Sequence, residues 1–341
     1  MDATVEKFTS KDLVTDQEIR WCPGCGDYSI VKQVQTVMPD LGIPRENIVF
    51  VSGIGCSSRF PYYMETYGMH SIHGRATAIA SGLKAARPEL SVWIVTGDGD
   101  SLSIGGNHTI HLLRRNFNVN ILLFNNQIYG LTKGQYSPTS EEGKVTKSTP
   151  MGSIDHPFNP IALCMGADAT FVARTMDRDP KHQQAILRRA NDHKGASFVE
   201  IYQNCNVFND GAFEVFTEKS SKKNETLFME SGKPLIFGDN NDKGIKLDGF
   251  NPVVVDLTAT GASANDMWIH DEHDRVKAGI LSRFFDNPSK PDHLPRPFGV
   301  FYEESRGCYE DGMTRQIEEA KAKKAADLDA LLRGKEIWTI N

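Results

Sequence analysis

The sequence contains no long apolar run and no surplus of positive charge. Its first residues, MDATVEKFTSKDLVTDQEIR, are polar throughout, so we expect neither a secretory signal nor a membrane-spanning segment. The formal net charge of -6 disfavours a nucleic-acid partner, because proteins that follow a phosphate backbone usually carry a basic surplus. We therefore expect a cytoplasmic protein with no membrane or nucleic-acid partner.

Cysteine is also scarce, with six residues in a chain of 341. Structural disulfides are rare in a reducing cytoplasm. We therefore interpret Cys22 and Cys25, in the motif WCPGCG, as metal-binding or redox-active rather than as a permanent disulfide. Taken alone, this pair leaves a zinc ion and an iron-sulfur cluster open.

The composition, 39% hydrophobic and 24% charged, is that of an ordinary soluble globular protein. Short apolar runs that end in Gly, Asn or Asp alternate with helical segments. This alternation predicts an α/β fold, a doubly wound parallel sheet that binds ligands at the carboxyl ends of its strands. The expected strands are NIVFVSG (47–53), SVWIVTGDG (91–99), NVNILLFNN (118–126), ATFVAR (169–174) and SFVEIYQ (197–203), and the expected helices cover 26–42, 74–89, 105–117 and 179–194.

We expect three regions along the chain. Residues 1–46 form an N-terminal segment with the cysteine pair, residues 47–210 form the α/β domain, and residues 211–341 form a C-terminal extension. The extension is rich in Gly, Asn and Lys and closes with a charged amphipathic helix at 314–334. It is too poor in apolar residues for a separate core, so we expect it to wrap the main domain or to contact a partner subunit.

Polar residues follow two of the expected strands, since GDGD comes after SVWIVT and NN comes after NVNILLF. Asp98 and an asparagine could then present hard oxygen ligands side by side, which suits Mg²⁺ shared with a phosphate. Gly97 and Gly99 would let a diphosphate approach the backbone closely, and a helix that starts near Leu102 would offer free N–H groups to it. A single GDG after a strand is common, whereas its combination with NN is much more specific.

This combination resembles the signature of thiamine diphosphate enzymes. The resemblance implies that Asp98, the side chain of Asn126 and the carbonyl of Ile128 bind Mg²⁺. It also implies that the diphosphate is lined by Gly99, Asp100, Gly130, Leu131 and Thr132.

A longer series of motifs is similar, in order and spacing, to the β subunits of 2-oxoacid:ferredoxin oxidoreductases. The motifs are WCPGCG, SGIGCSSRFP, HGRATAIASGLKAA, GDGDSLSIGGNH, NNQIYGLTKGQYSPTS and CNVFND, over roughly residues 20–210. Two later stretches, GKPLIFG and GIKLDGF, resemble the 2-oxoglutarate branch. The resemblance adds further residues to the implied thiamine diphosphate site: Ile54, Gly55, Cys56, Ser57, Ser58, His73 and Gly97.

The resemblance implies a reversible reaction in which a 2-oxoacid, coenzyme A and oxidised ferredoxin give acyl-CoA, CO₂ and reduced ferredoxin. For 2-oxoglutarate the product is succinyl-CoA; pyruvate or another 2-oxoacid is the alternative substrate. Two electrons leave the substrate and ferredoxin carries one at a time, so a one-electron acceptor is needed near the thiamine. A 4Fe-4S cluster held by four thiolates meets this need. The resemblance implies four ligands for it: Cys22, Cys25, Cys56 and Cys205.

A zinc ion bound by four thiolates is the alternative, although zinc ribbons usually supply two CxxC pairs. Cys56 follows the strand NIVFVSG and so belongs to the same sheet edge as GDGD. This position predicts that the cluster lies beside the thiamine. Two cysteines are left over: we expect Cys164 to be a small buried hydrophobe and Cys308 to be an ordinary loop thiol.

Arg59 would project from the same turn as Cys56 toward the substrate. A guanidinium can hold the distal carboxylate of a dicarboxylic 2-oxoacid, and the resemblance points to the same role. The alternative is an ion pair of Arg59 with Glu65 or another surface acid. His73 is a candidate for a phosphate or pyrimidine contact, with a capping or core role as the alternative.

No glutamate of this chain stands out as the group that activates the thiamine pyrimidine. The resemblance implies that an α subunit supplies this glutamate and the pyrimidine-binding domain, in an (αβ)₂ heterotetramer, so this chain alone should be inactive. Two other classes stay open. A non-redox thiamine-dependent decarboxylase subunit would not need four converging cysteines, and a zinc-binding regulatory or nucleic-acid module would not need the magnesium ligands.

Overall fold

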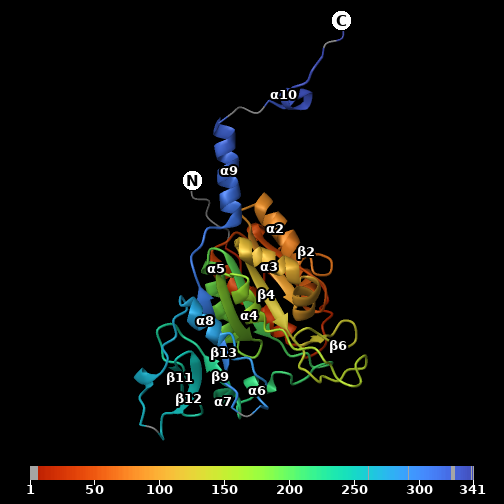
Figure 1. The fold of residues 1–341 in the computed structure, drawn as a ribbon. Coiled ribbons are helices and arrows are strands. Elements are labelled where there is room, and N and C mark those ends of the chain that lie inside the picture. Colours follow the sequence, from red (N-terminus) through yellow and green to blue (C-terminus); the bar gives the residue numbers. More distant parts are fainter. Residues whose placement is uncertain (1–6, 260, 291, 324–326, 339, 341) are drawn as a thin grey trace.

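The centre of the computed structural model is an eight-stranded, mostly parallel sheet (Figure 1). The structure describes residues 7–259, 261–290, 292–323, 327–338 and 340. In spatial order the strands are β2 (Tyr67–His70), β1 (Ile48–Ser52), β3 (Ser91–Gly97), β4 (Val119–Asn125), β8 (Ala196–Tyr202), β7 (Phe171–Met176), β13 (Arg296–Glu303) and β9 (Thr226–Phe228). All five strands expected from the sequence are present, so the α/β fold class is confirmed.

Helices cover both faces of the sheet, because the central strands are buried on both sides. Alternate strand residues such as Val51, Ile94 and Leu123 belong to one apolar core, and the intervening residues, such as Phe50 and Val95, belong to a second. The first core is closed by α2 (Ala76–Ala86), α3 (Gly106–Arg115), α4 (Pro160–Gly166) and α8 (Arg275–Leu281). The second is closed by α1 (Asp27–Val37), the 3-10 helix η3 (Ser57–Tyr63) and α5 (Pro180–Asp192).

Residues beyond 210 complete the sheet rather than form a separate layer. Strand β13 pairs antiparallel with β7 and parallel with β9. Apolar side chains of this segment, among them Leu227, Trp268 and Phe301, share one core with the parallel strands. A small antiparallel sheet of β10 (Ile236–Phe237), β11 (Lys243–Asp248) and β12 (Asn251–Asp256) lies beside them.

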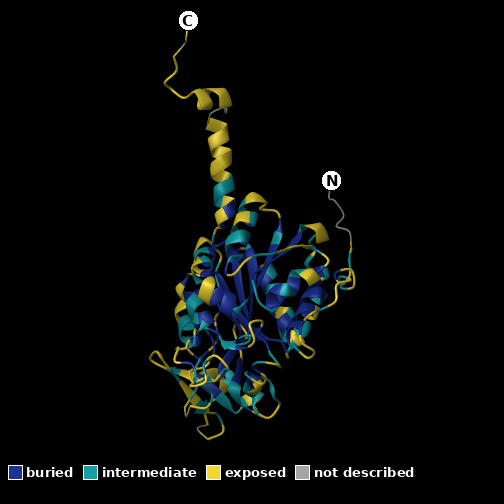
Figure 2. Cartoon of the chain, turned by 90° about the vertical axis from the view of Figure 1, so that its right-hand side faces the viewer, coloured by how far each residue is buried: buried dark blue, intermediate teal, exposed yellow. Residues whose placement is uncertain are grey.

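The C-terminal helix expected at 314–334 is two helices. Helix α9 (Tyr309–Lys323) projects away from the body and is mostly exposed along its length (Figure 2). Asp327 then has φ -122° and its side chain accepts a hydrogen bond from the Ala330 N–H, so it caps a new helix, α10 (Leu328–Arg333). The single-helix expectation was therefore wrong, because the sequence pattern did not reveal this cap. None of the helices that the structure describes has the length and apolar character needed to cross a membrane.

The remaining elements lie mainly in the loops that follow the parallel strands. They are η1 (Met38–Leu41), η2 (Arg45–Asn47), the π-helical turn η4 (Asp100–Ile104), β5 (Ile128–Tyr129), β6 (Gln135–Tyr136), α6 (Glu214–Thr217), α7 (Lys222–Glu225) and η5 (Ala264–Asp266). Turn η4 follows β3, and the hairpin β5–β6 follows β4. These loops therefore bring the predicted polar residues to the carboxyl edge of the sheet.

Candidate active site

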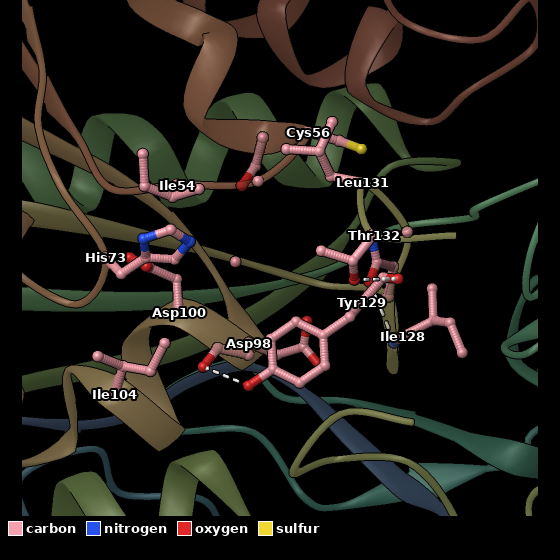
Figure 3. Close-up of a pocket in the computed structure, with 16 residues that line it drawn as sticks. Ile54, Cys56, His73, Asp98, Asp100, Ile104, Ile128, Tyr129, Leu131 and Thr132 are labelled. Atoms are coloured by element: carbon pink, nitrogen blue, oxygen red, sulfur yellow. Dashed lines mark hydrogen bonds between the residues drawn. The ribbon is translucent and has the colours of Figure 1, made fainter. Parts of the chain in front are cut away.

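A pocket that is partly open to solvent lies at the carboxyl ends of β1, β3 and β4. Every residue predicted to contact the thiamine cofactor lines it except Ser58, which is fully buried. Figure 3 shows the labelled side chains, with His73 and Asp100 on one side and Tyr129 and Thr132 on the other. Tyr129 and Ile104, which were not among the predicted site residues, also line the pocket.

Asp98 is the more deeply buried of the two carboxylates that line the pocket, with 2% of its surface exposed. Its Oδ2 accepts hydrogen bonds from the hydroxyl groups of Ser137 at 2.5 Å and Thr139 at 2.6 Å. Burial raises the pKa of Asp98 to about 6, although these two hydroxyls act in the opposite direction. A buried carboxylate of this kind gains from a bound cation, which stabilises its ionised form.

The two asparagines after β4 have different surroundings. Asn126 lines the pocket, and its Oδ1 accepts a hydrogen bond from the Ile128 N–H at 3.2 Å. Asn125 is 1% exposed, and its Nδ2 donates to Glu200 Oε1 at 2.7 Å. Gln127, the next residue, has φ 57°, so the chain turns after Asn126, and Ile128 also lines the pocket. Of the NN pair, only Asn126 therefore presents its side chain to a ligand.

Asn125 connects the pocket to a buried ion pair. The Thr139 hydroxyl lies 2.9 Å from Asn125 Oδ1 and also donates to Asp98, so its single hydrogen is shared between two acceptors. On the other side, Glu200 Oε2 accepts from Arg174 Nε at 2.7 Å, and both of these side chains are essentially inaccessible to solvent. A continuous polar network thus runs from Asp98 through the sheet to β7.

Asp100 shapes the wall of the pocket through its own hydrogen bonds. Oδ1 accepts from the Gly74 N–H at 2.7 Å, and Oδ2 accepts from the Thr96 hydroxyl at 3.2 Å. Burial raises the pKa of Asp100, while these donors lower it. Asp100 therefore joins the end of β3 to the loop that carries His73, which is exposed.

Gly99 is required by close packing. A Cβ atom at this position would lie 2.1 Å from the ring of Tyr129. The Tyr129 hydroxyl donates to the Gly99 carbonyl at 3.0 Å. The ring therefore closes one wall of the pocket directly over the GDGD turn.

The cysteines of the implied cluster come from three separate segments and converge. A Cβ atom on Gly130 would lie 3.7 Å from the sulfurs of both Cys56 and Cys205. Burial raises the pKa of Cys56 to about 12, with further increases from the charges of Asp27, Cys205 and Cys22. Burial likewise raises the pKa of Cys25, and Cys205 and Cys56 contribute to that increase. Cys56 is also a lining residue of the pocket, so the cysteines adjoin the site.

Hydrogen bonds hold the N-terminal segment against this edge. The Trp21 indole N–H donates to the Cys56 carbonyl at 2.7 Å, and the Cys25 N–H closes a turn onto the Cys22 carbonyl at 3.0 Å. Gln203, fully buried at the end of β8, donates from Nε2 to Cys25 Sγ at 3.1 Å. No sequence motif indicates a role for Gln203, whose one signal is its position two residues before Cys205.

All six cysteines are free thiols. Cys164 lies in the core and Cys308 lies in the loop before α9, both as expected, and Cys308 is 5% exposed. Within the described part of the chain, no three His, Cys, Asp or Glu side chains are arranged to hold a single metal ion.

Arg59 does not line the pocket. Its Nε donates to the Tyr63 hydroxyl at 3.0 Å, and its guanidinium lies 5.8 Å from the centroid of the Tyr62 ring. Among the residues with described positions, no carboxylate lies within 4.0 Å of it, so the alternative pairing with Glu65 is not formed.

The fold and the pocket are those of a thiamine diphosphate-binding domain. Residues 53–201 match the family model described as "Thiamine pyrophosphate enzyme, C-terminal TPP binding domain". The chain is 52% identical to the 2-oxoglutarate oxidoreductase subunit KorB of Mycobacterium tuberculosis, over 97% of this chain and 88% of that protein. It is 40% identical to the 2-oxoglutarate synthase subunit KorB of Methanothermobacter marburgensis, over 67% of this chain and 77% of that protein.

A solved structure agrees with these relatives. The chain superposes with a TM-score of 0.77 and 31% identity, over 98% of both chains, on the 2-oxoglutarate:ferredoxin oxidoreductase from Magnetococcus marinus with 2-oxoglutarate, coenzyme A and succinyl-CoA bound. The chain therefore belongs to the β subunits of the 2-oxoacid:ferredoxin oxidoreductases. The resemblance identified from the sequence motifs is confirmed.

Proposed function

We propose that this β subunit acts with an α subunit in the reversible oxidative decarboxylation of 2-oxoglutarate with coenzyme A, which gives succinyl-CoA and CO₂. Electrons would pass through a 4Fe-4S cluster to ferredoxin. The observation that carries the proposal is that Cys56 lines the same pocket as Asp98 and Asn126. A redox centre beside the thiamine site distinguishes this enzyme from a non-redox decarboxylase.

Three oxygens from the ends of β3 and β4 would hold Mg²⁺: a carboxylate oxygen of Asp98, Asn126 Oδ1 and the Ile128 carbonyl. Oxygen donors of this kind suit Mg²⁺ that is shared with a phosphate. The Ile128 N–H donates to Asn126 Oδ1, and the Gly130 N–H donates to the Ile128 carbonyl. A carbonyl oxygen has two lone pairs, so each can accept this hydrogen bond and still bind a cation. The donor set therefore fits the ion, and thiamine diphosphate bound with it would supply the electron sink for decarboxylation.

We favour a cluster over a single zinc ion, because no three His, Cys, Asp or Glu side chains among the described residues are arranged to hold one metal ion. Zinc needs four sulfurs at about 2.3 Å from one point, whereas the thiolates of a cluster bind separate iron atoms and stand further apart. Burial and mutual charge raise the pKa values of Cys25 and Cys56, so both thiolates gain from a cationic centre between them. Cys22, Cys25, Cys56 and Cys205 would be the four ligands.

The chain's own side chains shape the site around these groups. Ser137 and Thr139 orient Asp98, Tyr129 excludes solvent from the GDGD turn, and Asp100 fixes the loop that carries His73. Arg59 has no carboxylate partner within the described residues, which leaves its charge for the distal carboxylate of 2-oxoglutarate. The α subunit would complete the site with the pyrimidine-binding domain and its glutamate, in an (αβ)₂ assembly.

The proposal is tested by co-expression with the α subunit and anaerobic purification. We expect about four irons and four sulfides for each β chain by the cluster stoichiometry, bound thiamine diphosphate and Mg²⁺, and viologen reduction that requires both 2-oxoglutarate and coenzyme A. Thiamine-dependent decarboxylation by a protein without iron or sulfide would instead establish the non-redox alternative. Bound zinc in place of iron would reject the cluster.

The substrate assignment has its own test. Arg59→Ala should lower kcat/KM for 2-oxoglutarate more than for pyruvate, because only the first substrate has a distal carboxylate. Arg87→Ala is a matched control, since Arg87 is an exposed arginine that pairs with Glu89. An unchanged ratio of the two kcat/KM values in Arg59→Ala would reject the role of Arg59.

A further inference from the structure

The side chain of Gln203 is buried next to one of the proposed cluster ligands. It is 0% exposed and lies just after β8, two residues before Cys205. Its Nε2 is 3.1 Å from Cys25 Sγ and 2.9 Å from the Asn204 carbonyl. One amide group thus has two donor hydrogens and two acceptors within reach.

The orientation of this amide is fixed by its surroundings. The Asn204 carbonyl can only accept hydrogen bonds, so the nitrogen of Gln203, and not its oxygen, must face it. The Gly26 N–H donates to the same carbonyl at 3.1 Å, which ties the Cys25 turn to this strand end. The second hydrogen of Nε2 is therefore directed to the sulfur.

The opposite end of the amide has no partner. Gln203 Oε1 is buried without a hydrogen-bond donor among the described residues. A buried amide with one unsatisfied atom is unfavourable for folding compared with an apolar side chain of the same shape. The hydrogen bond to the Asn204 carbonyl offsets only part of this cost, whereas the second hydrogen bond, to the sulfur, places an N–H donor at a proposed cluster ligand.

We propose that Gln203 is a positioning residue that tunes the reduction potential of the cluster through its hydrogen bond to Cys25. This inference rests on the proposed function, since it assumes that Cys25 binds the cluster. Reduction adds one electron to the cluster and increases the negative charge on its sulfurs. An N–H donor stabilises that charge and raises the potential. Removal of the donor should therefore make the cluster harder to reduce.

The first test uses Gln203→Met in the co-expressed α/β enzyme. Methionine keeps the length of the side chain and removes the N–H donors. We expect unchanged iron and sulfide content, and a redox equilibrium about tenfold further toward the oxidised cluster, equal to a fall of about 59 mV in a titration followed by electron paramagnetic resonance. Gln183→Met is the matched control, because Gln183 is also 0% exposed but its side-chain amide has no partner among the described residues.

A potential of Gln203→Met equal to that of the wild-type enzyme, with full iron content, would overturn the proposal. If Gln203→Met binds no iron, the proposal is tested instead on the wild-type enzyme labelled with ¹⁵N in its glutamine amides. Electron-nuclear double resonance should then detect a coupled, exchangeable proton and a glutamine nitrogen at the reduced cluster, and their absence would reject the hydrogen bond. A wild-type enzyme without iron would be a different result, because it contradicts the cluster itself.

Discussion

Two buried carboxyl groups near Cys56, those of Asp98 and Asp27, have different surroundings. Asp98 receives two hydroxyl hydrogen bonds and lines an open pocket. Asp27, at the start of α1, is 1% exposed, and no hydroxyl or amide group among the described residues donates to its oxygens, although the neighbouring Cys25 side chain lowers its pKa. Burial raises the pKa of Asp98 to about 6 and the pKa of Asp27 to about 7.

The difference shows that burial of a carboxylate does not by itself mark a metal site. At Asp98, donors and an adjacent cavity keep the ionised form available and leave room for a cation. At Asp27, desolvation dominates, and the charge of Asp177 raises the pKa further. The network of hydrogen bonds and the access to the pocket therefore separate a candidate ligand from a structural acid, and variants of each region can test this contrast.

The largest expected effect comes from breaking the buried end of the Asp98 network. Arg174→Met leaves Glu200 as an uncompensated buried charge, so we expect the free energy of unfolding to fall by about 3–5 kcal/mol. Arg178→Met, which removes the exposed pair with Glu218, should change it by less than about 1 kcal/mol. Urea denaturation followed by tryptophan fluorescence measures both, and equal effects would contradict the importance of the buried pair.

Asp98→Asn should strongly reduce cofactor affinity. The substitution keeps the shape of the side chain but removes the charge that Mg²⁺ needs, so we expect binding of thiamine diphosphate with Mg²⁺ to weaken by about 100-fold or more. Equilibrium dialysis of the assembled enzyme measures this affinity. Unchanged binding would remove Asp98 from the ligand set.

Thr139→Val tests the donors around Asp98. Valine has nearly the same shape as threonine but cannot donate to Oδ2, so we expect cofactor affinity to fall by about tenfold. Thr139→Ser keeps a hydroxyl group and should stay close to the wild-type affinity. If Thr139→Ser binds the cofactor as weakly as Thr139→Val, loss of the hydroxyl group does not explain the lower affinity.

The pKa of Asp98 predicts a pH dependence of cofactor binding. Mg²⁺ binds the ionised carboxylate, and the free carboxyl group has a pKa of about 6, so binding below this pH must release a proton. Affinity should therefore fall by up to about tenfold per pH unit below pH 6 and be nearly constant above pH 7. Titrations between pH 5 and 8 measure it, and a flat profile would contradict the raised pKa.

Asp27→Asn is expected to have the smallest effect on the cofactor. Asp27 does not line the pocket, so thiamine diphosphate affinity should stay within about threefold of the wild type. The same dialysis assay compares it directly with Asp98→Asn. A loss as large as that of Asp98→Asn would show that the two carboxyl groups belong to one site.

Much of the site could be predicted from the sequence, because the strands are short apolar runs with polar residues at their ends. GDGD and NN mark the ends of β3 and β4, and parallel strands bring such ends to one edge. The residues that support them could not be found this way. Ser137 and Thr139 lie about forty positions after Asp98 in the chain, and they reach it only because the hairpin β5–β6 folds back.

The sequence by itself determined the α/β fold, the candidate metal ligands and the family, since these depend on local apolar patterns and on short motifs. Only the tertiary structure decided that Ser137 and Thr139 donate to Asp98, that β13 completes the sheet, and that Gln203 donates to Cys25. The physical reason is that side-chain hydrogen bonds act over about 3 Å. Which groups come within that distance depends on how distant segments pack, and residue spacing along the chain does not encode it.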